Sequence, residues 1–158
     1  MIVLGRIKFF GALFLFLITG FSLLHADPNG FGIGLIVGEP TGISAKYYLS
    51  QSKAVDAGAG WSVIKKFIRF HGDFLFHNRK FFEEQLDLPL VLYYGFGVKT
   101  ILSDDFGLGL RIPLGVLHDI KKTNIDLFLE IVPGMDVLPE TKFGFDAALG
   151  ARYYFISK

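Results

Sequence analysis

Apolar residues alternate with small or polar residues along most of the chain between residues 31 and 155. This period of two is typical of β-strands whose two faces meet different surroundings. Short clusters of turn-forming and charged residues, such as EPT, SQSK and LSDD, interrupt the pattern. The pattern predicts eight hairpin-connected strands, namely Phe31–Gly38, Gly42–Leu49, Ala54–Val63, Ile68–His77, Leu88–Ile101, Phe106–Leu117, Ile125–Pro133 and Phe143–Phe155.

The two faces of these predicted strands differ completely in charge. One face carries large apolar side chains, among them Leu35, Trp61 and Phe145, and no Lys, Arg, Asp or Glu. The opposite face carries most of the glycines. It also holds all the charges of the eight segments, five basic and five acidic, at Lys46, Asp56, Arg69, Asp73, Lys99, Arg111, Asp126, Glu130, Asp146 and Arg152. Equal numbers of opposite charges permit pairing, which buried charges need.

Volume decides which face lies inside a barrel of eight strands. Such a barrel is only wide enough for side chains to fill it, and the apolar face offers about 40 residues, many of them Phe. We therefore expect the charged face inside and the apolar face outside, in contact with lipid. The expected fold class is an all-β, eight-stranded antiparallel up-and-down transmembrane β-barrel. The alternative is a soluble, exported barrel of lipocalin type that binds an apolar ligand, and it needs the opposite orientation.

The first 26 residues have the order of a secretory signal peptide. Two basic residues and no acidic one precede the apolar run Phe9–Leu24, and Ala26 offers a small residue for cleavage. We expect a helical signal peptide over residues 1–26, cleaved after Ala26, and a barrel domain over residues 27–158. The alternative is an uncleaved membrane anchor, although the apolar run is shorter than the roughly 20 residues that a spanning helix needs.

The signal peptide, the eight alternating strands and the glycine-rich charged face together resemble the small bacterial outer-membrane barrels of the OmpA transmembrane domain and OmpX type. The opening GFGIGLIVGEPTGISAKYYL, with its GEPTG turn, further resembles an uncharacterised family of such barrels, as do LPLVLYYGFGVKT, DLFLEIVPGMDVLP and GARYYF. The resemblance covers residues 30–156. It implies a bacterial outer-membrane location, contact with outer-membrane lipid and help from the barrel-assembly machinery. Two features depart from these barrels, since residues 156–158 follow the last aromatic and Asn78–Asp87 is a long link.

Composition excludes several classes of protein. Hydrophobic residues make up 51% of the 158 residues and charged residues only 20%, which is unlike a disordered chain. The formal net charge of +1 provides no basic field for nucleic acid. The chain has no Cys, so disulfides, Cys zinc sites and thiol catalysis are excluded.

A candidate metal site lies on the charged face of one predicted strand, where His71, Asp73 and His77 follow one another. Neutral His and carboxylate groups bind zinc and other transition metals. Successive residues on one face of a strand are about 7 Å apart, however, so these three cannot close on one ion without help from other strands. We therefore expect them to join an ion-pair network and assign no metal ligand.

A lipid-modifying barrel enzyme is a further alternative. Some enzymes of this kind carry a His-x-Ser string on a strand, whereas this chain has His71-Gly72-Asp73 and His118-Asp119-Ile120, without a Ser for the His to activate. We therefore expect no catalytic residue, no cofactor and no enzymatic activity. The expected role is structural or surface interaction by a monomer whose interior is plugged by charges, with an unspecified extracellular protein as a possible partner.

Overall fold

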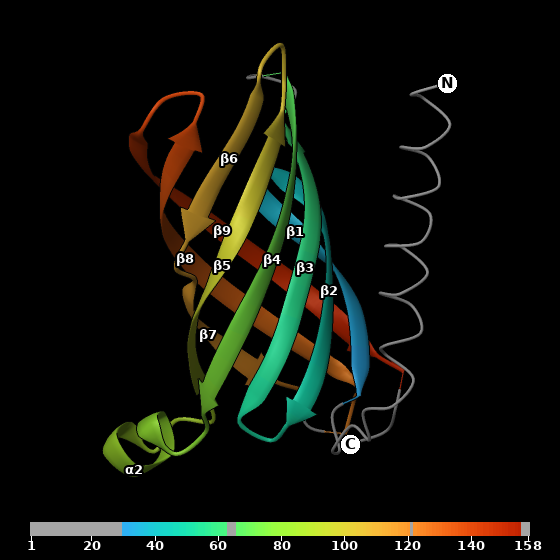
Figure 1. The fold of residues 1–158 in the computed structure, drawn as a ribbon. Helices are drawn as coiled ribbons and strands as arrows, with labels where there is room; N and C mark the ends of the chain where they lie inside the picture. Colours follow the sequence, from blue (N-terminus) through green and yellow to red (C-terminus); the bar gives the residue numbers. More distant parts are fainter. Residues whose placement is uncertain (1–29, 63–65, 121, 156–158) are drawn as a thin grey trace.

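The strands form a closed antiparallel ring in the computed structural model, which describes residues 30–62, 66–120 and 122–155 (Figure 1). The strands are β1 (Phe31–Glu39), β2 (Thr41–Ser50), β3 (Lys53–Ser62), β4 (Phe67–Asn78), β5 (Val91–Leu102), β6 (Phe106–Arg111), β7 (Leu114–Asp119), β8 (Ile125–Leu138) and β9 (Lys142–Tyr154). Neighbours in the chain pair with each other, except for β6 and β7, and β1 pairs with β9 to close the ring. Because β6 and β7 share one position between β5 and β8, the ring has eight positions. The prediction of an eight-stranded up-and-down barrel is confirmed.

One predicted strand is divided in the structure. The expected continuous segment Phe106–Leu117 is β6 followed by β7, and the break falls at Ile112 and Pro113. Proline has no N–H to donate to a ladder, which explains the interruption. The ring stays joined there, because Ile112 N–H donates to the Pro133 carbonyl at 2.9 Å and the Pro113 carbonyl accepts from Gly95 N–H at 2.9 Å.

Most other boundaries differ from the prediction by one to three residues, and two regions differ more. Strand β8 continues five residues beyond the expected end at Pro133, to Leu138. The long link Asn78–Asp87 contains a short helix, α2 (Phe81–Leu86). The Asn78 Oδ1 atom accepts the N–H groups of residues 80 and 81 and so supports its first turn. No helix of the described residues is long and apolar enough to cross a membrane.

The alternation of faces follows the predicted orientation. Along β6, the exposed Phe106, Leu108 and Leu110 alternate with buried Gly107, Gly109 and Arg111. Around the ring, large apolar side chains dominate the exposed face, and the buried charges lie on the other face with a few apolar residues such as Leu75, Leu117 and Phe128. The apolar face is therefore the outer face, and the alternative in which it encloses a ligand has the wrong orientation.

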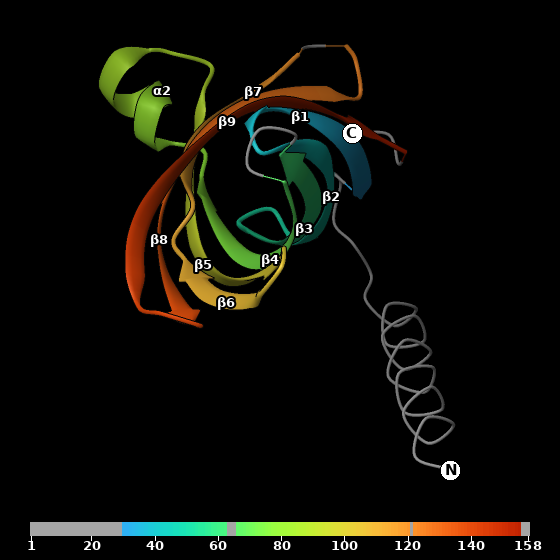
Figure 2. The same ribbon diagram turned by 90° about the horizontal axis from the view of Figure 1, so that it is seen from above.

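The two ends of the barrel differ. We call one the α2 end, which also holds the β2–β3 turn, and the other the far end, which holds the β5–β6 and β8–β9 turns (Figure 1). Figure 2 looks along the barrel, with α2 projecting to one side of the ring. The expected signal peptide, its cleavage after Ala26 and the domain boundary there all lie outside the described residues.

Candidate functional site

The predicted charged residues line the interior of the barrel. They occupy inward positions of the strands, and the alternation that exposes the apolar residues also buries these charges. Asp146 is only partly buried, with 26% of its side chain exposed. The other members of the predicted set are buried, namely Lys46, Asp56, Arg69, Asp73, Lys99, Arg111, Asp126, Glu130 and Arg152.

Arg152 of β9 is one centre of the interior network. Its Nη2 atom lies 2.7 Å from Oδ2 of Asp56 on β3, and its Nε atom donates to the Ser44 hydroxyl at 2.9 Å. Its Nη1 atom lies 4.0 Å from Oδ1 of Asp126 on β8. The Tyr154 hydroxyl donates to the other oxygen of Asp126 at 2.7 Å. One guanidinium therefore joins two carboxylates that come from well-separated strands.

Arg111 of β6 is a second centre. Its Nε atom lies 3.1 Å from Oδ1 of Asp73, and its Nη2 atom donates to Oε1 of Glu130 at 3.1 Å. The Tyr93 hydroxyl donates to the second oxygen of Glu130 at 2.9 Å. Gly97 leaves room for this arrangement, because a Cβ atom there would collide with the carboxylate of Asp73.

Two further ion pairs lie towards the far end. The Nη1 atom of Arg69 is 2.5 Å from Oδ2 of Asp146, and Nζ of Lys99 is 2.9 Å from Oδ1 of Asp136. Sequence reasoning missed Asp136, because the strand that carries it was expected to end at Pro133. The signal was present in the chain, since Asp136 continues the same alternating positions as Glu130.

Lys46 differs from the other basic residues of the set. It is fully buried, yet no ion pair to it occurs among the described residues, and its Nζ atom has no hydrogen-bond partner there. The Nζ atom lies 5.0 Å from the ring centre of Tyr48 and 4.9 Å from that of Tyr93. These are cation–π distances. The balance of five bases and five acids therefore does not produce five simple pairs.

The structure separates His77 from His71 and Asp73, with which the sequence grouped it as a candidate metal site. His77 packs against the rings of Tyr48 and Tyr93, with ring centres 5.1 and 5.6 Å away. The Nε2 atom of His71 instead lies 3.6 Å from Oδ1 of Asp56 and 4.0 Å from Oδ2 of Asp73. Asp56 comes from the neighbouring strand, which an inspection of one strand alone could not include.

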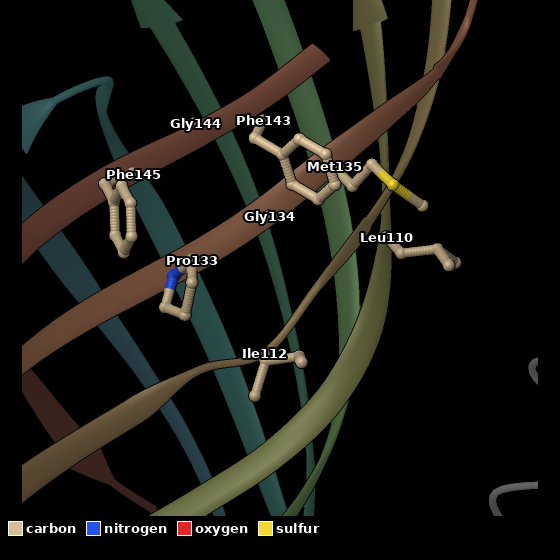
Figure 3. Close-up of a pocket in the computed structure, with 8 residues that line it drawn as sticks. All are labelled: Leu110, Ile112, Pro133, Gly134, Met135, Phe143, Gly144 and Phe145. Carbon is tan, nitrogen blue, oxygen red and sulfur yellow. The ribbon is translucent and has the colours of Figure 1, made fainter. Parts of the chain in front are cut away.

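The outer wall carries a shallow apolar hollow of about 280 Å³ where β6, β8 and β9 meet (Figure 3). Leu110, Met135 and Phe143 border one part of it, and Pro133 and Phe145 border another. It opens outwards from the barrel wall and is separate from the charged interior. The hollow offers apolar contact and no group that could carry out catalysis.

Comparisons with known proteins agree on the fold. The sequence matches no protein-family model and no curated protein. The structure is similar to the N-terminal β-barrel domain of OprF from Pseudomonas aeruginosa, with 16% identity, a TM-score of 0.53 and coverage of 80% of this chain and 98% of that one. It is also similar to Neisserial surface protein A, with 17% identity, a TM-score of 0.50 and coverage of 79% and 93%. The chain therefore has the fold of the small OmpA-like barrels.

Proposed function

We propose that this protein is an integral barrel of the bacterial outer membrane, with a plugged interior and a structural or surface-interaction role. The observation that carries this proposal is the apolar outer face, which surrounds a closed ring whose charges are inside. Lipid requires this arrangement, since it solvates apolar side chains and cannot satisfy charged ones.

Large exposed side chains on separate sides of the ring support the contact with lipid. The exposed fraction is 65% for Leu35 on β1, 61% for Phe96 on β5 and 81% for Phe145 on β9. A soluble monomer rarely exposes a continuous apolar surface larger than a few hundred Å². An apolar face around the whole barrel is therefore better explained by a bilayer than by water.

Closure of the ring and the exposed aromatic residues provide further support. Because β1 pairs with β9, the strands of the described residues form a closed ring without an edge strand, as a barrel in lipid requires. Trp61 lies exposed towards the far end, and Tyr153 lies exposed towards the α2 end. Aromatic residues at both ends are typical of the interfacial girdles of membrane barrels.

The interior supports a closed pore and a role other than transport. Eight strands enclose only enough space for side chains. Arg152 and Arg111 cross that space to carboxylates on other strands, so large charged groups occupy the middle of the barrel. The proposal includes a monomer that contacts outer-membrane lipid, depends on the barrel-assembly machinery, and has no catalytic residue or cofactor.

Heat-modified mobility on a gel tests the proposal. The chain is expressed with its own first segment, and the outer membrane is isolated and extracted with carbonate or urea. We expect the protein to stay in the membrane and to show different mobility before and after boiling. Leu129→Arg places a charge on the outer face and should cost about 2–4 kcal/mol at mid-bilayer, so the folded band should be lost.

Gln51→Arg is the matched control, because Gln51 is exposed in the β2–β3 turn at the α2 end. It should assemble like the unaltered chain. A soluble periplasmic protein without a heat shift would contradict the proposal, as would a Leu129→Arg variant that assembles as well as Gln51→Arg.

A further inference from the structure

Three potential ligand atoms converge inside the barrel from two neighbouring strands. In the β3–β4 register, Asp56 is opposite Asp73 and Gly58 is opposite His71. A Cβ atom at Gly58 would collide with the imidazole of His71, so the ring lies across β3 because residue 58 has no side chain. This orientation turns Nε2 of His71 towards Oδ1 of Asp56 and Oδ2 of Asp73, and the three atoms lie within 4.8 Å of one another.

The separations within this cluster are longer than hydrogen bonds. They are 3.6 Å from His71 to Asp56 and 4.0 Å from His71 to Asp73. Metal–ligand bonds of about 2.0–2.2 Å place neighbouring ligand atoms roughly 3–4 Å apart around one ion. Small side-chain movements would therefore bring all three atoms to a single ion between them.

The remaining carboxylate oxygens are already held by guanidinium groups. Oδ2 of Asp56 contacts Arg152 at 2.7 Å, and Oδ1 of Asp73 contacts Arg111 at 3.1 Å. Each carboxylate thus keeps one oxygen directed at His71. Groups that orient the ligands of a metal in this way are as much a part of a metal site as the ligands themselves.

The connected ion pairs also have an excess of negative charge. Two guanidinium groups are shared among four carboxylates. The group consists of Arg111, Arg152, Asp56, Asp73, Asp126 and Glu130. Its formal charge is −2 when His71 is neutral. Lys46 makes no ion pair among the described residues, but it is buried in the same interior, opposite Asp56 in the β2–β3 register, and its ammonium brings the formal charge to −1. Lys99, opposite His71 in the β4–β5 register, directs its amine to Asp136. An excess of negative charge favours a cation beside His71.

We infer that Asp56, His71 and Asp73 bind one divalent transition-metal ion inside the barrel. An imidazole nitrogen with two carboxylate oxygens suits zinc and similar ions, whereas calcium and magnesium prefer oxygen ligands alone. Three protein ligands leave a position for water. The side chain of His71 is 11% exposed, so the site is not completely enclosed. This inference depends on the barrel fold and not on the location proposed above.

Metal binding to the folded barrel in detergent tests the inference. The chain is prepared without an affinity tag, and folding of each variant is verified by its heat-modified mobility. Zinc binding is measured by competition with a chromophoric chelator, and cobalt is added as a spectroscopic probe. We expect one zinc ion per chain and a cobalt absorption spectrum typical of nitrogen and oxygen ligands.

His71→Asn removes the imidazole ligand and should weaken zinc binding by at least about tenfold. His77→Asn is the matched control, because His77 is a buried histidine of the same strand that lies outside the cluster. It should keep the affinity and the cobalt spectrum. Folded wild-type protein that binds neither ion would overturn the inference, as would equal binding by His71→Asn or equal loss in His77→Asn.

Discussion

Arg152 and Asp56 form an ion pair at 2.7 Å, although β1 and β2 separate their strands in the ring. Both side chains are buried, and the guanidinium also lies 3.7 Å from the ring centre of Phe128. The pair therefore links opposite parts of the wall through the interior. The stability of the barrel should therefore depend strongly on the Arg152 guanidinium.

Replacement of Arg152 by Met should destabilise the barrel strongly. It leaves the carboxylates of Asp56 and Asp126 buried without their guanidinium, and breaking a buried pair in this way costs about 3–5 kcal/mol. The measurement is equilibrium unfolding in urea, in detergent micelles. Arg79→Met is the control, because the Arg79–Asp119 pair at 3.0 Å is about one-third exposed and should contribute less than about 1 kcal/mol. Equal decreases in the free energy of unfolding would show that the interior pair stabilises the barrel no more than the exposed pair.

Two glycines of the barrel should respond differently to the same substitution. At Gly97 a Cβ atom would collide with the Asp73 carboxylate and the Gly72 carbonyl, whereas at Gly144 it would meet nothing within 4 Å. Gly97→Ala should therefore lower the free energy of unfolding by about 1–3 kcal/mol. Gly144→Ala should leave it unchanged or raise it by up to about 1 kcal/mol, since it restricts the unfolded chain. Both values come from urea unfolding, and the reverse order would contradict the interior packing described here.

The break between β6 and β7 should be the weakest part of the wall. Pro113 and Pro133 lie close together there and supply no amide hydrogen to the ladder. Amides in peptides covering residues 110–116 should therefore exchange with deuterium faster than those covering residues 54–60, where the β3–β4 register is continuous. Mass spectrometry of the folded protein measures both. Uniform protection around the ring would show that the backbone contacts of Ile112 are as strong as a regular ladder.

The period-two pattern was sufficient to predict the approximate positions of the strands and the orientation of their faces, but it left Asp136 out of the interior charges. It could not predict the division at Pro113, because the side chains keep alternating through the break even though the proline cannot donate to the ladder. It also missed α2, where FFEEQL breaks the alternation without any feature that separates a helix from a long turn.

The partners of the interior charges depend on information that the sequence pattern does not contain. Contacts such as Arg152 with Asp56 arise from the tilt and register of strands that are distant in the chain. Lys46 illustrates the limit, because the count of charges suggests a partner for it and the structure places it between tyrosine rings. The convergence of His71 with Asp56 and Asp73 likewise becomes visible only when β3 and β4 are aligned.

The pairing of β1 with β9 is the contact that closes the barrel. These are the first and last strands of the chain, and they share a register from Gly32↔Tyr154 to Glu39↔Ala147. Without β9, strands β1 and β8 each keep a row of unpaired backbone groups, which membrane lipid does not tolerate. In the outer-membrane setting proposed above, a barrel that lacks β9 would present two open edges to lipid, and the β1–β9 pairing removes both at once.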